Sequence, residues 1–306
     1  MQEINELLKK YKLKPIKYRK IKKTLLIETS NGKYSIKENT PNKTKIYEYL
    51  KSRNFDYIPN IITKDKDDYE ITEFVESYAI PKEQKIIDMI DLISLLHNKT
   101  THYKEVTEDD YKEIYEKIKN RIEYLYNYYT DTITIIDTKI YMSPSEYALA
   151  RNISIIFQTI NFINKEIDSW YNIVKEKTKI RQTIIHNNLE LDHYISNDKK
   201  YLISWDNAKI DMPIYDIYKL YINHGLEYDF SELLKRYEKN YHLHEDEKKL
   251  LFILISIPPI ISKKNTEYEN CVEINKLIEI MYKTKKLISP YYSKHRKEDD
   301  EQKNKN

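Results

Sequence analysis

The sequence predicts an α+β protein with a small β-rich part at the N-terminus and a larger, mostly helical part after it. The first observation is an Asn-Gly pair at 31–32 between two short runs rich in β-branched residues, a strong signal for a β-hairpin. The second is that hydrophobic residues after about residue 80 repeat with the period of an α-helix. We therefore expect a small lobe at 1–76, a large helical lobe at 77–288 and a charged, disordered tail at 289–306.

Each element of the small lobe has its own sequence signal. Gly32 lies in the hairpin turn, where a positive φ angle favours glycine. The segment 43–52 has the pattern of a short helix. The segment 58–76 predicts two further strands, joined by a polar turn at Lys64 to Asp68.

The large lobe is predicted to consist of helices that begin at recognisable caps. A helix is expected at 82–98, and the next begins after Thr107, where the sequence TEDD is a capping box. A third begins at Ser143, which is followed by Pro144 at the first helical position. A short β segment is expected at 193–206, after which helices resume as far as the tail.

The composition excludes several classes of protein. The chain has 306 residues but only 2 Gly, so neither a GxGxxG dinucleotide turn nor a glycine-rich P-loop can be written in it. Its single Cys excludes a disulfide framework and a zinc site built from cysteines. The N-terminal residues lack an apolar signal-peptide core, and the apolar run 250–261 predicts a buried helix that ends at Pro258. We therefore expect a cytoplasmic protein.

The most informative stretch is 184–221, with the sequence IIHNNLELDHYISNDKKYLISWDNAKIDMPIYDIYKLY. It contains an HxNL segment at 186–189, a predicted hairpin around the polar turn 197–199, and a DxPxxD pattern at 211–216. This stretch resembles the catalytic segment of the aminoglycoside phosphotransferase/choline kinase superfamily, and the DxPxxD pattern is most similar to that of spore-coat CotS proteins. The resemblance implies a bilobal protein-kinase-like fold.

The resemblance extends over nearly the whole chain. Lys37 matches the lysine of the third strand in that fold, and Glu48 lies on the helix that follows it. The segment TEFVE, which includes Glu73 and Val75, resembles the linker between the two lobes. The resemblance therefore implies that Lys37, Glu48, Glu73 and Val75 are nucleotide-binding residues.

The residues that carry the chemistry in that superfamily are replaced here. His186 is retained, but Asn188 stands at the position of the catalytic aspartate. His193 and Ser204 stand at the positions of the metal-binding asparagine and aspartate. An amide cannot accept a proton, and general-base assistance is commonly worth about 10²–10⁴-fold. Imidazole and a neutral hydroxyl are poor ligands for Mg²⁺, so we expect no intact catalytic residue and no metal site.

The resemblance and these replacements together imply a pseudokinase that acts as a binding or scaffold protein, with the spore coat as the place that CotS similarity suggests. We expect no cofactor, allow ATP binding without Mg²⁺, and expect a protein partner whose identity the sequence does not give. Asp216 matches a helix aspartate with a structural role. The rival hypothesis is an ATP-dependent small-molecule kinase in which Asp206 holds the metal in place of Ser204.

Residues 9–23 suggest a third function. They hold nine basic side chains, two tyrosines and no acid. Such runs can bind the phosphates of nucleic acid or of anionic lipids. The alternative is the solvated face of a first strand, and we favour this structural interpretation over a nucleic-acid or membrane partner.

Overall fold

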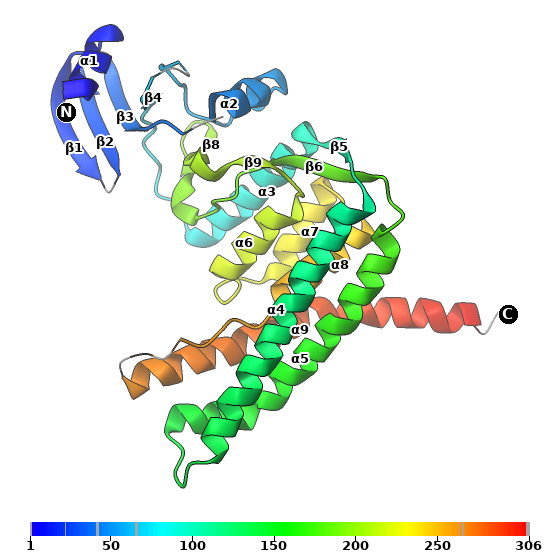
Figure 1. Cartoon of the computed structure of the whole chain (residues 1–306). Helices are drawn as coiled ribbons and strands as arrows, with labels where there is room; N and C mark the ends of the chain where they lie inside the picture. Colours follow the sequence, from blue (N-terminus) through cyan, green and yellow to red (C-terminus); the bar gives the residue numbers. More distant parts are fainter. Residues whose placement is uncertain are drawn as a thin grey trace. The chain divides into compact units, whose positions relative to one another are not determined.

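The computed structural model describes residues 2–21, 23–40, 43–64, 67–262, 264 and 266–303. The predicted α+β class is confirmed, because antiparallel strands dominate the N-terminal part and helices dominate the remainder (Figure 1). In the described part of the chain, no helix is long and apolar enough to cross a membrane.

The chain forms two compact units, and the first combines the residues up to 102 with 182–219 and 239–241. This unit extends past the lobe boundary expected at residue 76. The reason is visible in the backbone, where Tyr78 donates a hydrogen bond to Ser196 and Leu202 donates one to Tyr57. We call residues 184–221 the kinase-type segment, after the resemblance described above. These bonds join it to the N-terminal residues, so the residues expected to form the candidate site lie within one unit.

The N-terminal sheet has the strand order β1-β2-β3-β4, with β1 at one edge (Figure 1). Helix α1, which the sequence analysis did not anticipate, packs on one face of this sheet. Leu7 and Leu8 of α1 are buried together with Ile27, Ile36 and Ile71 from β2, β3 and β4. The elements are α1 Gln2–Lys10, β1 Pro15–Ile21, β2 Thr24–Thr29, β3 Gly32–Glu38 and β4 Tyr69–Glu73.

The other face of the sheet carries polar side chains. Paired residues on neighbouring strands share a face, so the register places Leu26, Ser35 and Thr72 in one row on the face opposite Ile36. The hydroxyl oxygens of Ser35 and Thr72 lie 2.6 Å apart. Lys37 lies on this same face, because it is two residues beyond Ser35.

One of the two strands predicted within 58–76 is not formed. Ile61 makes an isolated bridge with Thr72, and the strand that follows is β4. The backbone N–H of Ile71 donates to the hydroxyl of Thr63 rather than to a backbone carbonyl, which interrupts the ladder. The predicted hairpin turn is confirmed, since Gly32 has a φ angle of 140°.

The remaining elements of the first unit either belong to the kinase-type segment or lie elsewhere in this unit. The hairpin predicted around the turn 197–199 is confirmed as β7 and β8. Strand β6, which the sequence analysis missed, leads directly into His186 and pairs with β9. The elements are α2 Lys43–Ser52, α3 Lys82–Thr100, β6 Lys179–Ile185, η1 Leu191–His193, β7 Tyr194–Ser196, β8 Lys200–Leu202, η2 Trp205–Asn207 and β9 Lys209–Asp211.

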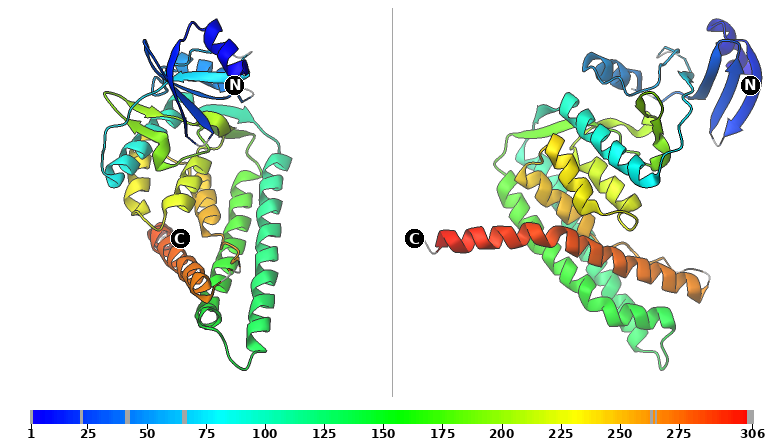
Figure 2. Two further views of the ribbon diagram at one scale, coloured as in Figure 1. Left: turned by 90° about the vertical axis from the view of Figure 1, so that its left-hand side faces the viewer. Right: turned by 180° about the vertical axis from the view of Figure 1, so that it is seen from behind.

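The second unit is helical, and its long helices α4 and α5 run side by side (Figures 1 and 2). Both begin at the predicted caps. The N–H of Thr107 donates to the Asp110 carboxylate at 2.8 Å, and the N–H of Ser143 donates to Glu146 at 3.0 Å. The remaining elements of the chain are β5 His102–Glu105, α4 Glu108–Asp137, α5 Pro144–Val174, α6 Ile214–His224, α7 Phe230–Asn240, α8 Glu245–Ser256 and α9 Glu267–Lys303. The part of α6 that carries Asp216 belongs to the first unit.

The C-terminal helices differ in how well the sequence predicted their ends. Helix α8 ends at Ser256, just before Pro258, as expected for a helix stopped by proline. Helix α9 continues through Lys303, where we expected an irregular tail from residue 289. Lysine and glutamate are good helix formers, and the buried Ile288 anchors the middle of this helix.

Candidate functional site

The polar face of the N-terminal sheet brings Lys37 to the kinase-type segment. Ile36 is buried against α1, so the next side chain on β3 points to the opposite face. The Nζ of Lys37 donates a hydrogen bond to the Oγ of Ser204 at 3.1 Å and lies 3.9 Å from Oδ2 of Asp206. Lys37 therefore contacts two of the positions singled out in the sequence.

A second lysine occupies the centre of this site. Lys43 is the first residue of α2 and is only 3% exposed. Its Nζ lies 3.0 Å from Oε1 of Glu70 and 2.7 Å from Oδ1 of Asp206, and the ring of Tyr47 packs beside it. The sequence analysis missed both Lys43 and Glu70, because a lysine at the start of a helix is ordinarily solvated.

The two carboxylates around Lys43 respond differently to their surroundings. Burial acts to raise the pKa of Asp206, but the charges of Lys43 and Lys37 outweigh it and hold that pKa below its usual value. Burial raises the pKa of Glu70, and the attraction of Lys43 offsets this only in part. The Asp206 carboxylate is therefore the more firmly ionised partner of the Lys43 ammonium.

Asp216 holds the loop after β6 through hydrogen bonds to its backbone. Its carboxylate is fully buried and accepts hydrogen bonds from the backbone N–H of His186 at 2.8 Å and of Asn187 at 2.7 Å. The Nε2 of His97 lies 3.2 Å from the same carboxylate. Asp216 therefore makes contacts that fix the backbone of this loop.

Asn187 takes the sharp turn of this loop. Its φ angle is 58°, in the left-handed region, which Asn tolerates better than most residues other than glycine. Its backbone carbonyl accepts a hydrogen bond from Nζ of Lys219 at 2.9 Å, and its side chain donates to the carbonyl of Asn207. Asn187 is therefore a residue type suited to the conformation that this turn requires.

His186 has a structural place in the site. Burial lowers its pKa to about 4 although Asp216 acts in the opposite direction, so the ring is neutral at physiological pH. Its Nε2 donates to the carbonyl of Ile203 at 2.9 Å, and its ring packs edge-on against Trp205. The ring thus ties the loop to the turn that carries Ser204.

Asn188 and His193 face each other across the loop. The backbone carbonyl of Asn188 accepts a hydrogen bond from Nδ1 of His193 at 2.7 Å. The side-chain Nδ2 of Asn188 lies 3.5 Å from the carbonyl of Ser204. The three replaced positions are therefore brought together, although the sequence separates them by up to sixteen residues.

The backbone at Ser204 is more suited to another residue. Its φ of 67° and ψ of 52° are left-handed, a conformation in which Asn and Asp are strongly enriched and serine is not. The resemblance implies an aspartate at this position. The turn therefore keeps the conformation that favours an aspartate while its side chain is a neutral hydroxyl.

The other predicted nucleotide-binding residues lie apart from this cluster. Helix α2 buries Lys43, Tyr47 and Leu50, which share one face, so Glu48 lies on the exposed side. The acid that Lys37 approaches is consequently Asp206 rather than Glu48. Glu73 is exposed at the end of β4, and Val75 is half-buried just after it.

The groups at this site do not fit a magnesium ion. Mg²⁺ requires several oxygen ligands, usually including carboxylates. Asp206 and Glu70 supply carboxylates here, but both are bound to the Lys43 ammonium. Over the described ranges, no group of three or more His, Cys, Asp or Glu side chains is arranged to hold a metal ion.

The basic run at 9–23 spans the end of α1 and the edge strand β1, and its Lys22 lies outside the described residues. Within it, Lys10 and Tyr11 both contact the carboxylate of Asp67. The side chains of β1 from Ile16 onward are exposed on both faces of the strand. Part of the basic run is therefore an exposed strand, as the structural interpretation of residues 9–23 expected.

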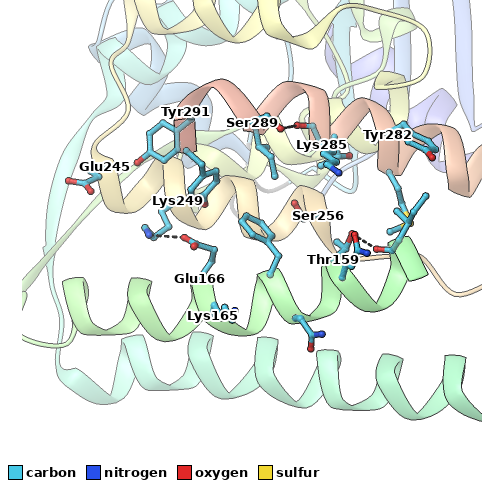
Figure 3. A pocket seen from close by; sticks show the side chains of 18 residues that line it. Thr159, Lys165, Glu166, Glu245, Lys249, Ser256, Tyr282, Lys285, Ser289 and Tyr291 are labelled. Atoms are coloured by element: carbon cyan, nitrogen blue, oxygen red, sulfur yellow. Dashed lines mark hydrogen bonds and ion pairs between the residues drawn. The ribbon is translucent and has the colours of Figure 1, made fainter. Parts of the chain in front are cut away.

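A cavity of about 950 Å³ lies in the second unit, between α5, α8 and α9 (Figure 3). Its wall includes Lys249, whose Nζ is bound by Glu166 at 2.8 Å and by Ser169 at 3.1 Å. All of its lining residues belong to the second unit. The cavity is therefore separate from the site around Lys43.

Comparisons with known proteins identify the fold. No family model matches the sequence, and no curated protein matches it. The chain is similar to the crystal structure of an aminoglycoside phosphotransferase from Alicyclobacillus acidocaldarius, with a TM-score of 0.71, 10% identity and 94% of each chain covered. It is also similar to the AMP-bound spectinomycin phosphotransferase, with a TM-score of 0.55, 12% identity, and 92% of this chain and 98% of that chain covered. The predicted fold, bilobal and kinase-like, of the aminoglycoside phosphotransferase type, is confirmed.

Proposed function

We propose that this chain is a pseudokinase of the aminoglycoside phosphotransferase type, which binds a ligand or partner and does not transfer phosphate. The observation that carries the proposal is the position of Lys43. Its ammonium group occupies the space between Glu70 and Asp206, where a divalent cation would need the same carboxylate oxygens. An internal cation therefore takes the place of an exchangeable one.

The replaced side chains support the same conclusion. Phosphoryl transfer depends on a carboxylate that orients the nucleophile and on metal ions that neutralise the phosphate charge. Asn188 offers an amide, and Ser204 offers a hydroxyl that is already bonded to Lys37. Electrostatic stabilisation is usually the largest contribution to such catalysis, so its loss removes most of the rate enhancement.

The remaining groups support binding of an anion without a metal. Lys37 places a partly exposed ammonium group beside Ser204, on the polar face that also carries the Ser35 hydroxyl. An ammonium group can attract phosphate oxygens directly. We therefore propose that any nucleotide bound here is bound free of Mg²⁺, in a cytoplasmic protein.

The proposal extends to an assembly role. The pattern at 211–216 resembles that of spore-coat CotS proteins, and Asp211 of this pattern bonds the N–H of Met212 at the entry to α6. This resemblance supports a role as a scaffold that holds a protein partner, with the spore coat as the setting.

Thermal unfolding with ATP, in EDTA and in Mg²⁺, tests the proposal. The expected result is the same midpoint shift in both buffers, together with no release or transfer of the γ-phosphate. Stabilisation that requires Mg²⁺ would contradict it, as would turnover that Asp206→Asn abolishes. The matched control is Asp192→Asn, because Asp192 is an exposed acid on η1.

The rival kinase hypothesis makes the opposite prediction from the same residue. It requires Asp206 to release Lys43 and to bind the metal. Lys43→Met would then free Asp206 and increase Mg²⁺-dependent ATP binding and turnover. The pseudokinase hypothesis predicts no turnover in this variant, because Asn188 and Ser204 still lack the required carboxylates.

A further inference from the structure

The loop between α4 and α5 presents apolar side chains to water. We call residues 135–147 the hairpin tip. Ile140 is 90% exposed and its neighbour Tyr141 is 88% exposed, and Ile135, Met142 and Tyr147 are also exposed. Single exposed apolar residues are common, but a contiguous group of this size marks an interaction surface.

The hairpin tip is held in a fixed shape. Lys139 pairs with Glu146 across the loop, and the N–H of Ser145 donates to Glu267 at 2.6 Å. Ser143 and Pro144 begin α5 at a complete cap. A loop that is already ordered loses little conformational entropy on binding, so its exposed side chains are suited to recognition.

A second exposed apolar group lies on the edge strand β1. Ile16 is 73% exposed, and Tyr18 and Ile21 are also exposed. We call Pro15–Ile21 the β1 edge, since β1 is the first strand in its sheet and has β2 as its neighbour on one side only. Backbone groups on the free side of an edge strand are available to another chain.

The two surfaces carry opposite charge. The hairpin tip contains the exposed Asp137 together with Glu146 and Lys139, which pair with each other, and Asp131 is exposed on α4 just before the tip. The β1 edge contains Lys17, Arg19 and Lys20, which are all exposed, and it contains no acid. Like charges therefore repel when two β1 edges or two tips approach, whereas a tip and an edge attract each other.

We propose that the hairpin tip of one copy of this chain docks on the β1 edge of a second copy. Ile140 and Tyr141 would pack against Ile16 and Tyr18, with Asp131 and Asp137 facing the basic side chains of β1. Each copy has one tip and one edge, so the contact is head-to-tail and repeats along a chain or closes into a ring. The partner is thus a second copy, and this proposal is independent of the activity of the site around Lys43.

Analytical ultracentrifugation of the full-length protein over a range of concentrations tests the contact. The expected result is a mass that rises with concentration beyond a dimer and falls when salt is added, because the charges are exposed. Two variants remove one surface each: Ile140→Ser with Tyr141→Ser at the tip, and Lys17→Glu with Arg19→Glu at the edge. Each variant alone is expected to remain monomeric.

Mixing the two variants distinguishes this contact from every symmetric one. The tip variant still has an intact edge and the edge variant an intact tip, so the mixture should form a dimer that grows no further. The matched control is Ile222→Ser with Tyr103→Ser, an exposed pair outside both surfaces, which should associate like the wild type. Thermal midpoints of all variants check that the fold is unchanged.

Three results would overturn the proposal. The first is a wild-type protein that stays monomeric at every concentration. The second is a tip variant or edge variant that associates as the wild type does, or a mixture that gives no dimer. The third is a monomer that binds anionic vesicles or DNA through the β1 edge, which would assign that surface to a different partner.

Discussion

The loop that carries Asn188 and the turn that carries Ser204 are held in different ways. The loop rests on backbone contacts, because Asp216 accepts the N–H groups of His186 and Asn187. The turn is surrounded by side-chain ions, with Lys37 on Ser204 and Lys43 on Asp206. The loop therefore depends on backbone contacts to one carboxylate, whereas the turn depends on the charged side chains around it.

This difference is what the proposed loss of phosphoryl transfer requires. Backbone hydrogen bonds to a buried carboxylate do not depend on which side chain the loop presents to solvent. Metal binding at this site, in contrast, would depend on the side chains at 188, 193, 204 and 206. Asp206 is the one carboxylate among them, and the cation bound to it in this structure is the Lys43 ammonium.

The largest loss of stability is expected when the carboxylate that holds the loop is removed. Asp216→Ala leaves two buried N–H groups and His97 without their carboxylate, and should lower the free energy of unfolding by about 4 kcal/mol. Urea unfolding measures the loss. The exposed Asp192→Ala is the control and should change stability by less than about 0.5 kcal/mol. A loss at Asp216 no larger than the control would show that the loop does not depend on this carboxylate.

The next effect concerns the ion pairs around Lys43. Lys43→Met keeps the length of the side chain but leaves Glu70 and Asp206 without their cation, and should cost about 3 kcal/mol. Adding Glu70→Gln to this variant should recover part of the loss, because one buried negative charge is then removed. Equal stabilities for the single and double variants would mean that Glu70 and Lys43 are not coupled.

The buried ring of His186 should make the free energy of unfolding depend on pH, with a change of similar size. Its pKa of about 4 in the folded chain lies below the ordinary value of 6.5, so the unfolded chain binds more protons between these values. Its contribution is complete above pH 6.5 and is lost as the pH falls towards 4, by up to about 3 kcal/mol. Unfolding curves of the wild type and His186→Gln should differ in slope over this window. Parallel slopes would show that the ring is not buried as a neutral group.

The smallest effect is expected at Glu48. Because Glu48 is exposed and Lys37 faces Asp206, Glu48→Gln should change stability by less than about 0.5 kcal/mol. Nucleotide-induced shifts in the thermal midpoint should also stay as in the wild type. A loss of nucleotide binding in this variant would restore Glu48 as the partner of Lys37.

Much of the architecture was predictable because its signals are local. Thr107, Ser143 and Pro258 mark helix ends through groups within four residues, and Gly32 marks a turn through its own φ angle. Helix α1 and strand β6 were missed because each depends on contacts with distant parts of the chain. The first of the two strands expected in 58–76 did not form for a different reason, because the Thr63 side chain accepts the N–H of Ile71.

The candidate site was predictable only where it matched a known pattern. His186, Asn188, His193 and Ser204 stand at spacings that the resemblance defines, and the fold brings them together. Lys43 carries no such pattern, and its partner Asp206 is 163 residues away in the sequence. A local sequence signal does not report that a lysine at the start of a helix will meet two carboxylates from elsewhere.

Mn²⁺ binding measured by electron paramagnetic resonance tests the central claim most directly, because it asks whether the site takes a divalent cation at all. The signal of free Mn²⁺ should stay unchanged when the wild-type protein is added. When ATP is present, the signal should fall only by the amount that ATP alone removes. A protein-dependent loss of that signal, abolished by Asp206→Asn and unaffected by Asp192→Asn, would contradict the claim that Lys43 has replaced the metal.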